Sequence, residues 1–299
     1  MSSLRAKIVR KISSAYVKRF AVASIDIQAT RKRLDRLGRL LRPAFGVKVE
    51  QSEVHGLYAE WLIPKDAMDG KVLLYLHGGG YMIGGCDMHR KMVSHIAKAG
   101  RIKALLPEYR LAPEHKYPNA IEDAVGCYKA LLADGIGAED IIIAGDSAGG
   151  GLTVGTTLAL RDAGEPLPAA LLLLSPFLDV TGSGASMQTR RDQDPWFRAE
   201  DLPFVADHYC EPHQRRYPEV SPVFANIEGM PRMFIQVGDD EILLSDSERL
   251  ADECVAAGID VELQVWPEMW HVFQMFIGKM PESRDAIQQM GQYIQTIWR

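Results

Sequence analysis

The chain alternates short apolar runs with longer amphipathic stretches over most of its length. Apolar and polar residues alternate over 46–52 and 54–63, which predicts a half-buried antiparallel pair of strands with a turn near 53–56. Apolar runs of strand length then recur, and we predict strands at 71–76, 102–106, 140–144, 169–174, 232–237 and 260–266. Helical periodicity fills the intervals, which predicts helices at 87–100, 118–133, 147–162, 244–257 and 282–298. This order indicates an α/β fold with a mostly parallel sheet covered by helices on both faces.

Two segments depart from that alternation. Residues 1–45 are helical in pattern, and their apolar positions are interleaved with basic residues; these positions are Leu4, Ile8, Ile12, Tyr16, Val17, Leu34, Leu37 and Leu41. Such spacing predicts helices that pack on their own domain through these side chains. Residues 177–222 are rich in glycine and proline around one helical patch near 199–209, which indicates an insertion over the sheet.

Composition and charge exclude several classes of protein. With 299 residues, 47% of them apolar and 24% charged, the chain has enough apolar side chains to fold, and its length suits one α/β domain with appendages. Its longest apolar runs are far shorter than the ~20 residues that a membrane-spanning helix needs. Residues 1–48 contain 13 Lys or Arg against 2 Asp or Glu, although the formal net charge is −5. A basic segment can meet anionic lipid or nucleic acid, but the interleaved apolar positions favour packing on the domain.

The sequence gives no sign of a cofactor or a disulfide framework. Its four cysteines lie far apart without a Cys-x-x-Cys pair, so we expect free thiols. Neither the phosphate-loop nor the dinucleotide-binding glycine pattern occurs, and no ligand cluster surrounds the histidines, so we expect no nucleotide cofactor and no metal. No apolar leader follows the basic N-terminal residues, which with the free thiols favours a cytoplasmic protein. From the interleaved apolar positions and the short apolar runs we expect no nucleic-acid partner and no stable membrane insertion.

The pentapeptide Gly-Asp-Ser-Ala-Gly at 145–149 supplies a candidate nucleophile, Ser147. It matches G-x-S-x-G, and it stands between a predicted strand and a small-residue helix start. That setting places a serine hydroxyl on a sharp, exposed turn. A serine needs a base to accept its proton, and the base needs a carboxylate to orient it, in the chain order Ser, acid, His. Only His271 lies late enough in the chain to be that base.

The acid is expected just after the 232–237 strand, where Asp239, Asp240 and Glu241 follow one another. The carboxyl ends of parallel strands collect catalytic groups, and all three residues meet that condition. The pattern by itself leaves the choice among them open.

A candidate oxyanion hole lies at the end of the 71–76 strand, where His77 precedes three glycines. The H-G-G-G pattern aims backbone N–H groups at a developing oxyanion. We expect the amides of Gly79, Gly80 and Ala148 to donate, and each such donor is typically worth ~3–4 kcal/mol of transition-state stabilisation. The ring of His77 is expected to support the loop.

Taken in order, these motifs resemble those of the bacterial hormone-sensitive-lipase-like esterases of the α/β-hydrolase fold. The resemblance extends from about residue 45 to the C-terminus and includes the sequence Tyr-Arg-Leu-Ala-Pro-Glu at 109–114. It implies an eight-stranded α/β-hydrolase domain over 46–299, with a cap made of helices at 1–45 and the insertion at about 177–222. Gap-free alignment places Glu241 at the position of the acid, with Asp240 as the alternative, where many relatives carry aspartate. It also suggests that Asp146 orients a loop and that Tyr109 and Arg110 brace the fold.

The resemblance implies a serine carboxylesterase that hydrolyses small esters of short to medium chain length without a cofactor. An amidase or peptidase using the same groups, or a non-catalytic receptor on the same fold, remain the alternatives. Aromatic residues and one methionine could line an acyl pocket, although plain packing is the commoner role of such residues; they are Met82, Trp196, Phe197, Phe204 and Tyr209. The last strand, at 260–266, would permit a homodimer if it forms an exposed edge.

Overall fold

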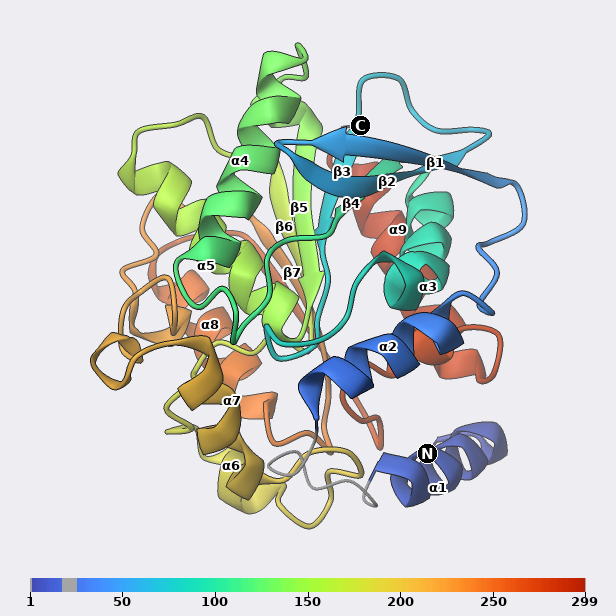
Figure 1. Cartoon of the computed structure of the whole chain (residues 1–299), viewed down its shortest axis with the longest axis vertical. Coiled ribbons are helices and arrows are strands. Elements are labelled where there is room, and N and C mark those ends of the chain that lie inside the picture. The colour runs from blue at the N-terminus through green and yellow to red at the C-terminus, as the bar shows by residue number, and fades with distance from the viewer. Residues whose placement is uncertain (1, 18–25, 299) are drawn as a thin grey trace.

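The computed structural model describes residues 2–17 and 26–298, and these form one eight-stranded sheet with helices on both faces (Figure 1). The strand order is β1-β2-β4-β3-β5-β6-β7-β8. The strands are β1 (Val47–Val54), β2 (Leu57–Pro64), β3 (Val72–Leu76), β4 (Lys103–Pro107), β5 (Ile141–Asp146), β6 (Ala170–Leu174), β7 (Met233–Gly238) and β8 (Val261–Trp266). The β1–β2 and β2–β4 pairs are antiparallel, and the remaining pairs are parallel. This confirms the predicted α/β-hydrolase fold.

The helices divide the core into two halves, one on each face of the sheet. The longer helices of the main domain are α3 (Cys86–Gly100), α4 (Asn119–Ala133), α5 (Ala148–Asp162), α8 (Leu244–Ala256) and α9 (Pro281–Thr296). Helices α3 and α9 cover one face, and α4, α5 and α8 cover the other, as Figure 1 shows. The central strands β3, β5, β6 and β7 are buried along their whole length, which is why they read as continuous apolar runs.

Most of the predicted boundaries agree with the structure to within two residues. The predicted strand at 54–63 begins later, at Leu57, because His55 and Gly56 take positive φ angles of 54° and 73° and form the hairpin turn. Strand β8 is an edge of the sheet, which is the condition that a homodimer through the last strand requires.

The N-terminal helices are α1 (Leu4–Val17) and α2 (Ile27–Gly38), and the predicted packing face of α1 is wrong. Its contact with the domain is made by Ala6, which is 1% exposed and packs with Met269 and Trp270. Leu4, Ile8 and Ile12, which were expected to be buried, lie 75%, 51% and 67% exposed.

The reason is that the inner face of α1 is joined largely by polar contacts. Ser3, just before the helix, and Arg10 make hydrogen bonds to the domain, and the small Ala6 allows close approach. In the second helix Leu34 is half-buried, but Leu37 is 46% exposed and Leu41, just beyond its end, is 36% exposed. The side chains of Tyr16 and Val17 lie outside the described residues.

The insertion consists of short helices joined by irregular chain. It contains α6 (Ser186–Thr189), α7 (Leu202–Tyr209) and the 3-10 turns η3 (Ala199–Asp201) and η4 (Pro212–Gln214), with η5 (Pro222–Phe224) at its end. In Figure 1, α6 and α7 lie at the same end of the sheet as α1. Among the described residues, no helix is both long enough and apolar enough to cross a bilayer.

Candidate active site

Ser147 lies on a strained turn between β5 and α5. Its φ of 52° and ψ of −122° are a conformation that non-glycine residues rarely adopt. The turn is tight enough to require glycine on both sides, because a Cβ at Gly145 would lie 2.2 Å from the oxygen of Gly149, and one at Gly149 would lie 2.0 Å from the oxygen of Leu76. The two glycines thus permit a sharp turn that places Ser147 directly after the carboxyl end of β5.

Backbone hydrogen bonds join this turn to the ends of the neighbouring strands. The amide of Ser147 donates to the oxygen of Leu174 at 2.9 Å, at the end of β6. The next residue, Ser175, accepts at its Oγ from the amide of Val272 at 3.1 Å. Val272 directly follows His271, so the candidate nucleophile and the candidate base belong to loops at the same edge of the sheet.

His271 and Glu241 form a buried pair. The Nδ1 atom of His271 lies 2.9 Å from Oε2 of Glu241, and the two residues are 2% and 0% exposed. The other oxygen of Glu241 accepts from the Ser175 hydroxyl at 2.7 Å and from the Gly238 amide at 2.6 Å. These donors fix the carboxylate, and the carboxylate fixes the imidazole so that Nε2 faces away from it.

Nε2 of His271 is buried and has no hydrogen-bond partner among the described residues. The structure therefore brings His271 and Glu241 together, while Ser147 Oγ and His271 Nε2 are not hydrogen-bonded. In enzymes without substrate such bonds are often long and tighten only in the complex.

The other two acid candidates face elsewhere. Asp240 forms an ion pair with Arg10 of α1. Asp239 accepts from the amide of Glu268 at 2.7 Å. Asp239 therefore holds the 266–270 segment, and Asp240 holds α1. Glu241 is the candidate that contacts His271.

The glycine loop after β3 offers unpaired amides. Gly79 and Gly80 have φ angles of 124° and 63°, and a Cβ at Gly79 would lie 2.0 Å from the oxygen of Ile83. Within the described part of the chain, the amides of Gly79, Gly80 and Ala148 have no acceptor. Three free donors at the start of α5 and on the adjacent loop suit an anionic oxygen.

Buried side chains support this loop from behind. His77 stacks on Tyr109 at 4.2 Å, and the Tyr109 hydroxyl donates to the His77 carbonyl at 2.6 Å. Asp146 accepts from the Gly78 amide at 3.1 Å and pairs with His89 at 3.4 Å. Burial lowers the pKa of His77 to about 3, so its ring stays neutral and braces the loop.

Arg110 forms a forked ion pair with Asp123, as expected for a residue that braces the fold. It makes this contact at the start of α4 rather than at the carboxyl edge of the sheet.

The insertion reaches the candidate base through Phe197. Its ring meets the His271 ring edge-on, with centroids 4.7 Å apart at 87°. Asp194, which is 1% exposed, accepts from the amides of Phe197 at 3.0 Å and of Ile242 at 3.0 Å, next to the acid. The side chain of Asp194 thus joins the insertion to the Glu241 segment.

The other proposed pocket residues make different contacts. Trp196 packs on Phe276, Phe204 on His208, and Tyr209 stacks on Tyr81 at 3.6 Å. A Cβ at Gly80 would lie 3.7 Å from Met82 and 3.5 Å from Val205 of α7, so Met82 and the insertion both lie against the glycine loop after β3.

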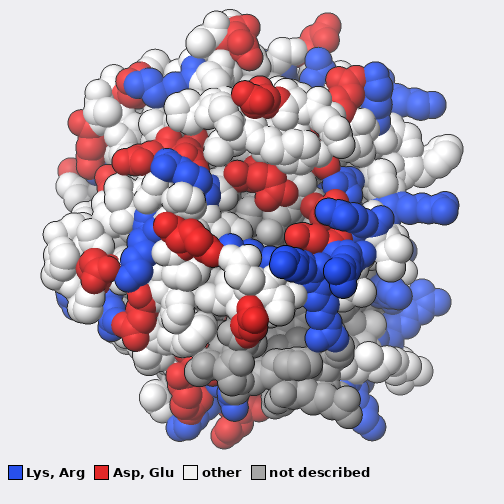
Figure 2. Space-filling view, in the orientation of Figure 1, with Lys and Arg blue, Asp and Glu red and all other residues white. Residues whose placement is uncertain are grey.

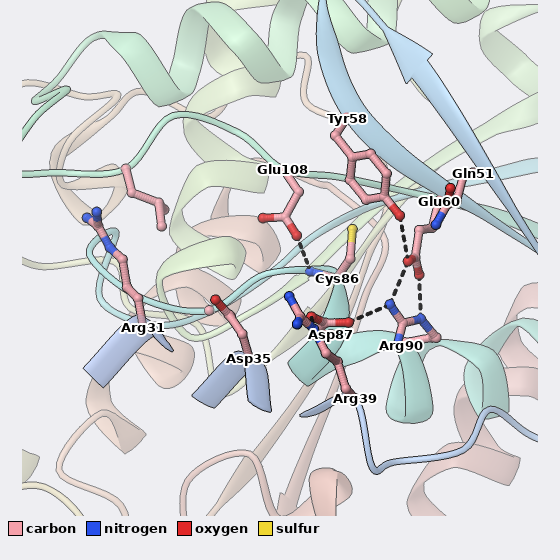
Figure 3. Close-up of a pocket in the computed structure, with 12 residues that line it drawn as sticks. Arg31, Asp35, Arg39, Gln51, Tyr58, Glu60, Cys86, Asp87, Arg90 and Glu108 are labelled. Carbon is pink, nitrogen blue, oxygen red and sulfur yellow. Dashed lines mark hydrogen bonds and ion pairs between the residues drawn. The ribbon is translucent and has the colours of Figure 1, made fainter. Parts of the chain in front are cut away.

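A cleft of about 560 Å³ lies between α2, the β1–β2 hairpin and the start of α3 (Figure 3). Its charged groups largely satisfy each other, because Arg90 pairs with both Glu60 and Asp87, and Glu108 accepts from the Cys86 amide at 2.7 Å. None of the predicted catalytic residues lines it. Arg39, just beyond the end of α2, donates to Asp87 at 2.9 Å and so ties that helix to α3 at this cleft.

Comparison with known proteins places the chain in a family. A family model described as the alpha/beta hydrolase fold matches residues 73–275. The acetyl-hydrolase of Streptomyces hygroscopicus is 40% identical over 238 residues, which is 80% of this chain and 79% of that protein. The chain belongs to the α/β-hydrolase fold family.

Solved structures narrow the assignment. An esterase from the bacterial hormone-sensitive lipase family superposes with a TM-score of 0.92 at 37% identity, covering 99% of both chains. EstE5, in crystals soaked with p-nitrophenyl butyrate, gives a TM-score of 0.92 at 36% identity and the same coverage. Within its fold family, the chain is a member of these bacterial hormone-sensitive-lipase-type esterases.

Ser175, His89 and Asp194 contact the candidate site or its neighbouring loops, and the sequence analysis assigned none of them to it. Ser175 follows β6 at the carboxyl edge, and this position is the only signal that could have drawn attention to it. His89 and Asp194 carry no local pattern. No cluster of metal-ligating side chains occurs among the described residues.

Proposed function

We propose that the chain hydrolyses carboxylic esters of short to medium chain length, with Ser147, His271 and Glu241 as its catalytic triad. The observation that carries the proposal is the buried His271–Glu241 pair, which leaves Nε2 without a partner at the sheet edge that also holds Ser147. The named relatives, an acetyl-hydrolase and an esterase soaked with a butyrate ester, support short acyl chains.

In the proposed mechanism, Ser147 Oγ attacks the ester carbonyl while Nε2 of His271 accepts its proton. Glu241 holds the imidazole tautomer and stabilises the imidazolium that forms. The amides of Gly79, Gly80 and Ala148 donate to the tetrahedral oxyanion. His271 then protonates the leaving alcohol, which leaves Ser147 acylated. Water, deprotonated by His271, attacks this acyl-enzyme in the same way and releases the carboxylic acid and the free serine.

We further propose that α1, α2 and the 177–222 insertion form a cap over this site. Two contacts support it: Phe197 lies against His271, and Arg31 of α2 donates to the carbonyl of Met82 at 2.7 Å, beside the oxyanion loop. The small space left under such a cap would favour short acyl groups.

Replacement of Ser147 by alanine is the primary test. We expect kcat for p-nitrophenyl butyrate to fall on the order of 10⁴–10⁶-fold with the fold unchanged. Ser52→Ala, on β1, is the matched control and should leave kcat unchanged. Turnover by S147A within tenfold of the wild type would end the proposal.

A series of p-nitrophenyl esters from acetate to palmitate tests the chain-length preference. We expect kcat/KM to be highest for acetate to hexanoate and to fall for longer chains. A p-nitroanilide with the same acyl group tests the amidase alternative. That alternative requires the anilide to be turned over at a rate comparable to that of the p-nitrophenyl ester. Labelling of Ser147 by an organophosphate without ester turnover would instead favour the receptor alternative.

A further inference from the structure

The outer face of α1 carries an apolar stripe that the domain does not cover. Leu4, Ile8 and Ile12 stand one helical turn apart on this face and are 75%, 51% and 67% exposed. Single exposed aliphatic residues are common on protein surfaces, but three in a line along one helix form a continuous apolar strip. The opposite face, through Ala6, makes the contact with the domain.

Basic side chains border this stripe. At 100° per residue, Lys7 and Lys11 lie along one side of it and Arg5 lies along the other, and all three are exposed. The sequence of α1 contains no acidic residue. Exposed basic residues continue on α2, at Lys32 and Arg36, and Figure 2 shows Lys and Arg side chains gathered over that helix.

We propose that the outer face of α1 docks on an anionic lipid surface. An aliphatic strip bordered by long cationic side chains is the pattern of a helix that lies in a membrane interface, with the aliphatic groups at the acyl boundary and the cations at the lipid phosphates. A second copy of the chain fits less well. A stable protein interface takes roughly 20–30 residues from each side, whereas this strip offers three aliphatic side chains on a convex helix.

The contacts of α1 give docking a consequence for the site. The amide of Ser2, two residues before α1, donates to Glu268 at 2.8 Å, and Arg10 of α1 donates to the carbonyl of Gln193 at 2.6 Å. The first contact holds the loop that carries His271, and the second holds the insertion. Docking through α1 therefore brings both segments near the bilayer, where the enzyme would meet esters that partition into lipid. That consequence rests on the proposed function, whereas docking itself does not.

Co-sedimentation of the full chain with vesicles tests the proposal. We expect binding to vesicles of phosphatidylcholine mixed with phosphatidylglycerol, weakening as salt is added, and little binding to phosphatidylcholine alone. Ser147→Ala should bind as the wild type does, which separates docking from catalysis.

Variants of α1 identify the surface. Combining Arg5→Gln, Lys7→Gln and Lys11→Gln should lower the partition coefficient by roughly 100-fold, because each cation near an anionic surface contributes about fivefold. Ile8→Gln with Ile12→Gln should lower it at least about tenfold. All these variants should hydrolyse a water-soluble ester at the wild-type rate, which shows that they are folded.

Matched controls lie far from α1. Lys48→Gln, Lys65→Gln and Lys129→Gln together remove the same charge from exposed positions, and Val255→Gln removes an aliphatic side chain that is 71% exposed on α8. Equal loss of binding in these controls, or equal binding to neutral vesicles, would overturn the proposal. The proposal would also be overturned if the wild-type chain formed a dimer that the Ile8→Gln and Ile12→Gln substitutions dissociated. Tighter binding to duplex DNA than to the vesicles would likewise overturn it.

Discussion

Two buried histidine–carboxylate pairs lie at the carboxyl edge of the sheet, and they differ in what their second ring nitrogen does. In the His271–Glu241 pair, Nδ1 contacts the carboxylate at 2.9 Å and Nε2 has no partner within the described chain. In the His89–Asp146 pair, Nε2 lies 3.4 Å from the carboxylate and Nδ1 lies 3.0 Å from the Gly85 carbonyl. All four side chains are buried, so burial alone does not distinguish a candidate base from a histidine that supports a loop.

In the His89–Asp146 pair, these contacts shift the pKa of both groups. Burial acts to lower the pKa of His89, but the Asp146 carboxylate, the Gly85 carbonyl and Glu108 together outweigh it and raise that pKa above its usual value. Burial likewise acts to raise the pKa of Asp146, and His89 with the Tyr75 hydroxyl holds it below its usual range. Asp146 of this pair also accepts from the Gly78 amide and so holds the glycine loop after β3. A histidine with both nitrogens engaged can anchor a loop, whereas one free nitrogen is needed to move a proton.

The comparison is tested most strongly by making the same substitution in both pairs. His271→Gln should lower kcat on the order of 10⁴–10⁶-fold, because the proton of Ser147 then has no acceptor. His89→Gln should lower kcat by up to about 10²-fold through displacement of the oxyanion loop, and it should lower the melting temperature as well. Rate measurements with p-nitrophenyl butyrate and thermal unfolding provide both readouts. If a folded His89→Gln variant lost as much activity as His271→Gln, the distinction between the pairs would be wrong.

The two neighbouring acids give the next largest contrast. Glu241→Gln should lower kcat by about 10⁴-fold, because the amide favours the wrong imidazole tautomer. Asp240→Asn breaks the partly exposed ion pair with Arg10, and it should change kcat less than about threefold and cost at most about 1 kcal/mol of stability. The kcat values of the two variants decide the assignment, and a larger loss in Asp240→Asn would transfer the role of acid to Asp240.

The sequence predicts the residues whose signal is local. The central strands are buried on both faces and therefore appear as apolar runs, and Ser147 is marked by glycines that the elbow requires. The acid could not be chosen from the pattern of 239–241 alone, because the choice depends on which carboxylate turns toward His271. Ser175 could not be assigned either, since its contact with Glu241 joins residues 66 positions apart.

The error on α1 has a related cause. Periodicity locates the apolar stripe on a helix, but it does not say which side of the helix meets the domain. In α1 the contact was decided by Ala6 and by polar bonds such as Arg10 to Gln193, which no periodicity reveals. The same limit hid Asp194, whose three backbone donors come from the insertion and from the chain after Glu241.

Asp194 supplies the smallest loss of activity that we expect from a contact of the candidate site, and it extends the comparison to the insertion. Burial raises the pKa of its carboxyl group, and backbone amides surround it. In Asp194→Asn one acceptor oxygen becomes a donor facing an amide, so the Phe197 ring should lose its fixed position against His271. We expect kcat/KM to fall about tenfold with a modest drop in melting temperature. Phe197→Leu, which removes the ring but keeps the Asp194 contacts, should give a similar fall in kcat/KM with less change in stability. If Phe197→Leu left kcat/KM unchanged, contact between the insertion and the imidazole would have no part in positioning the base.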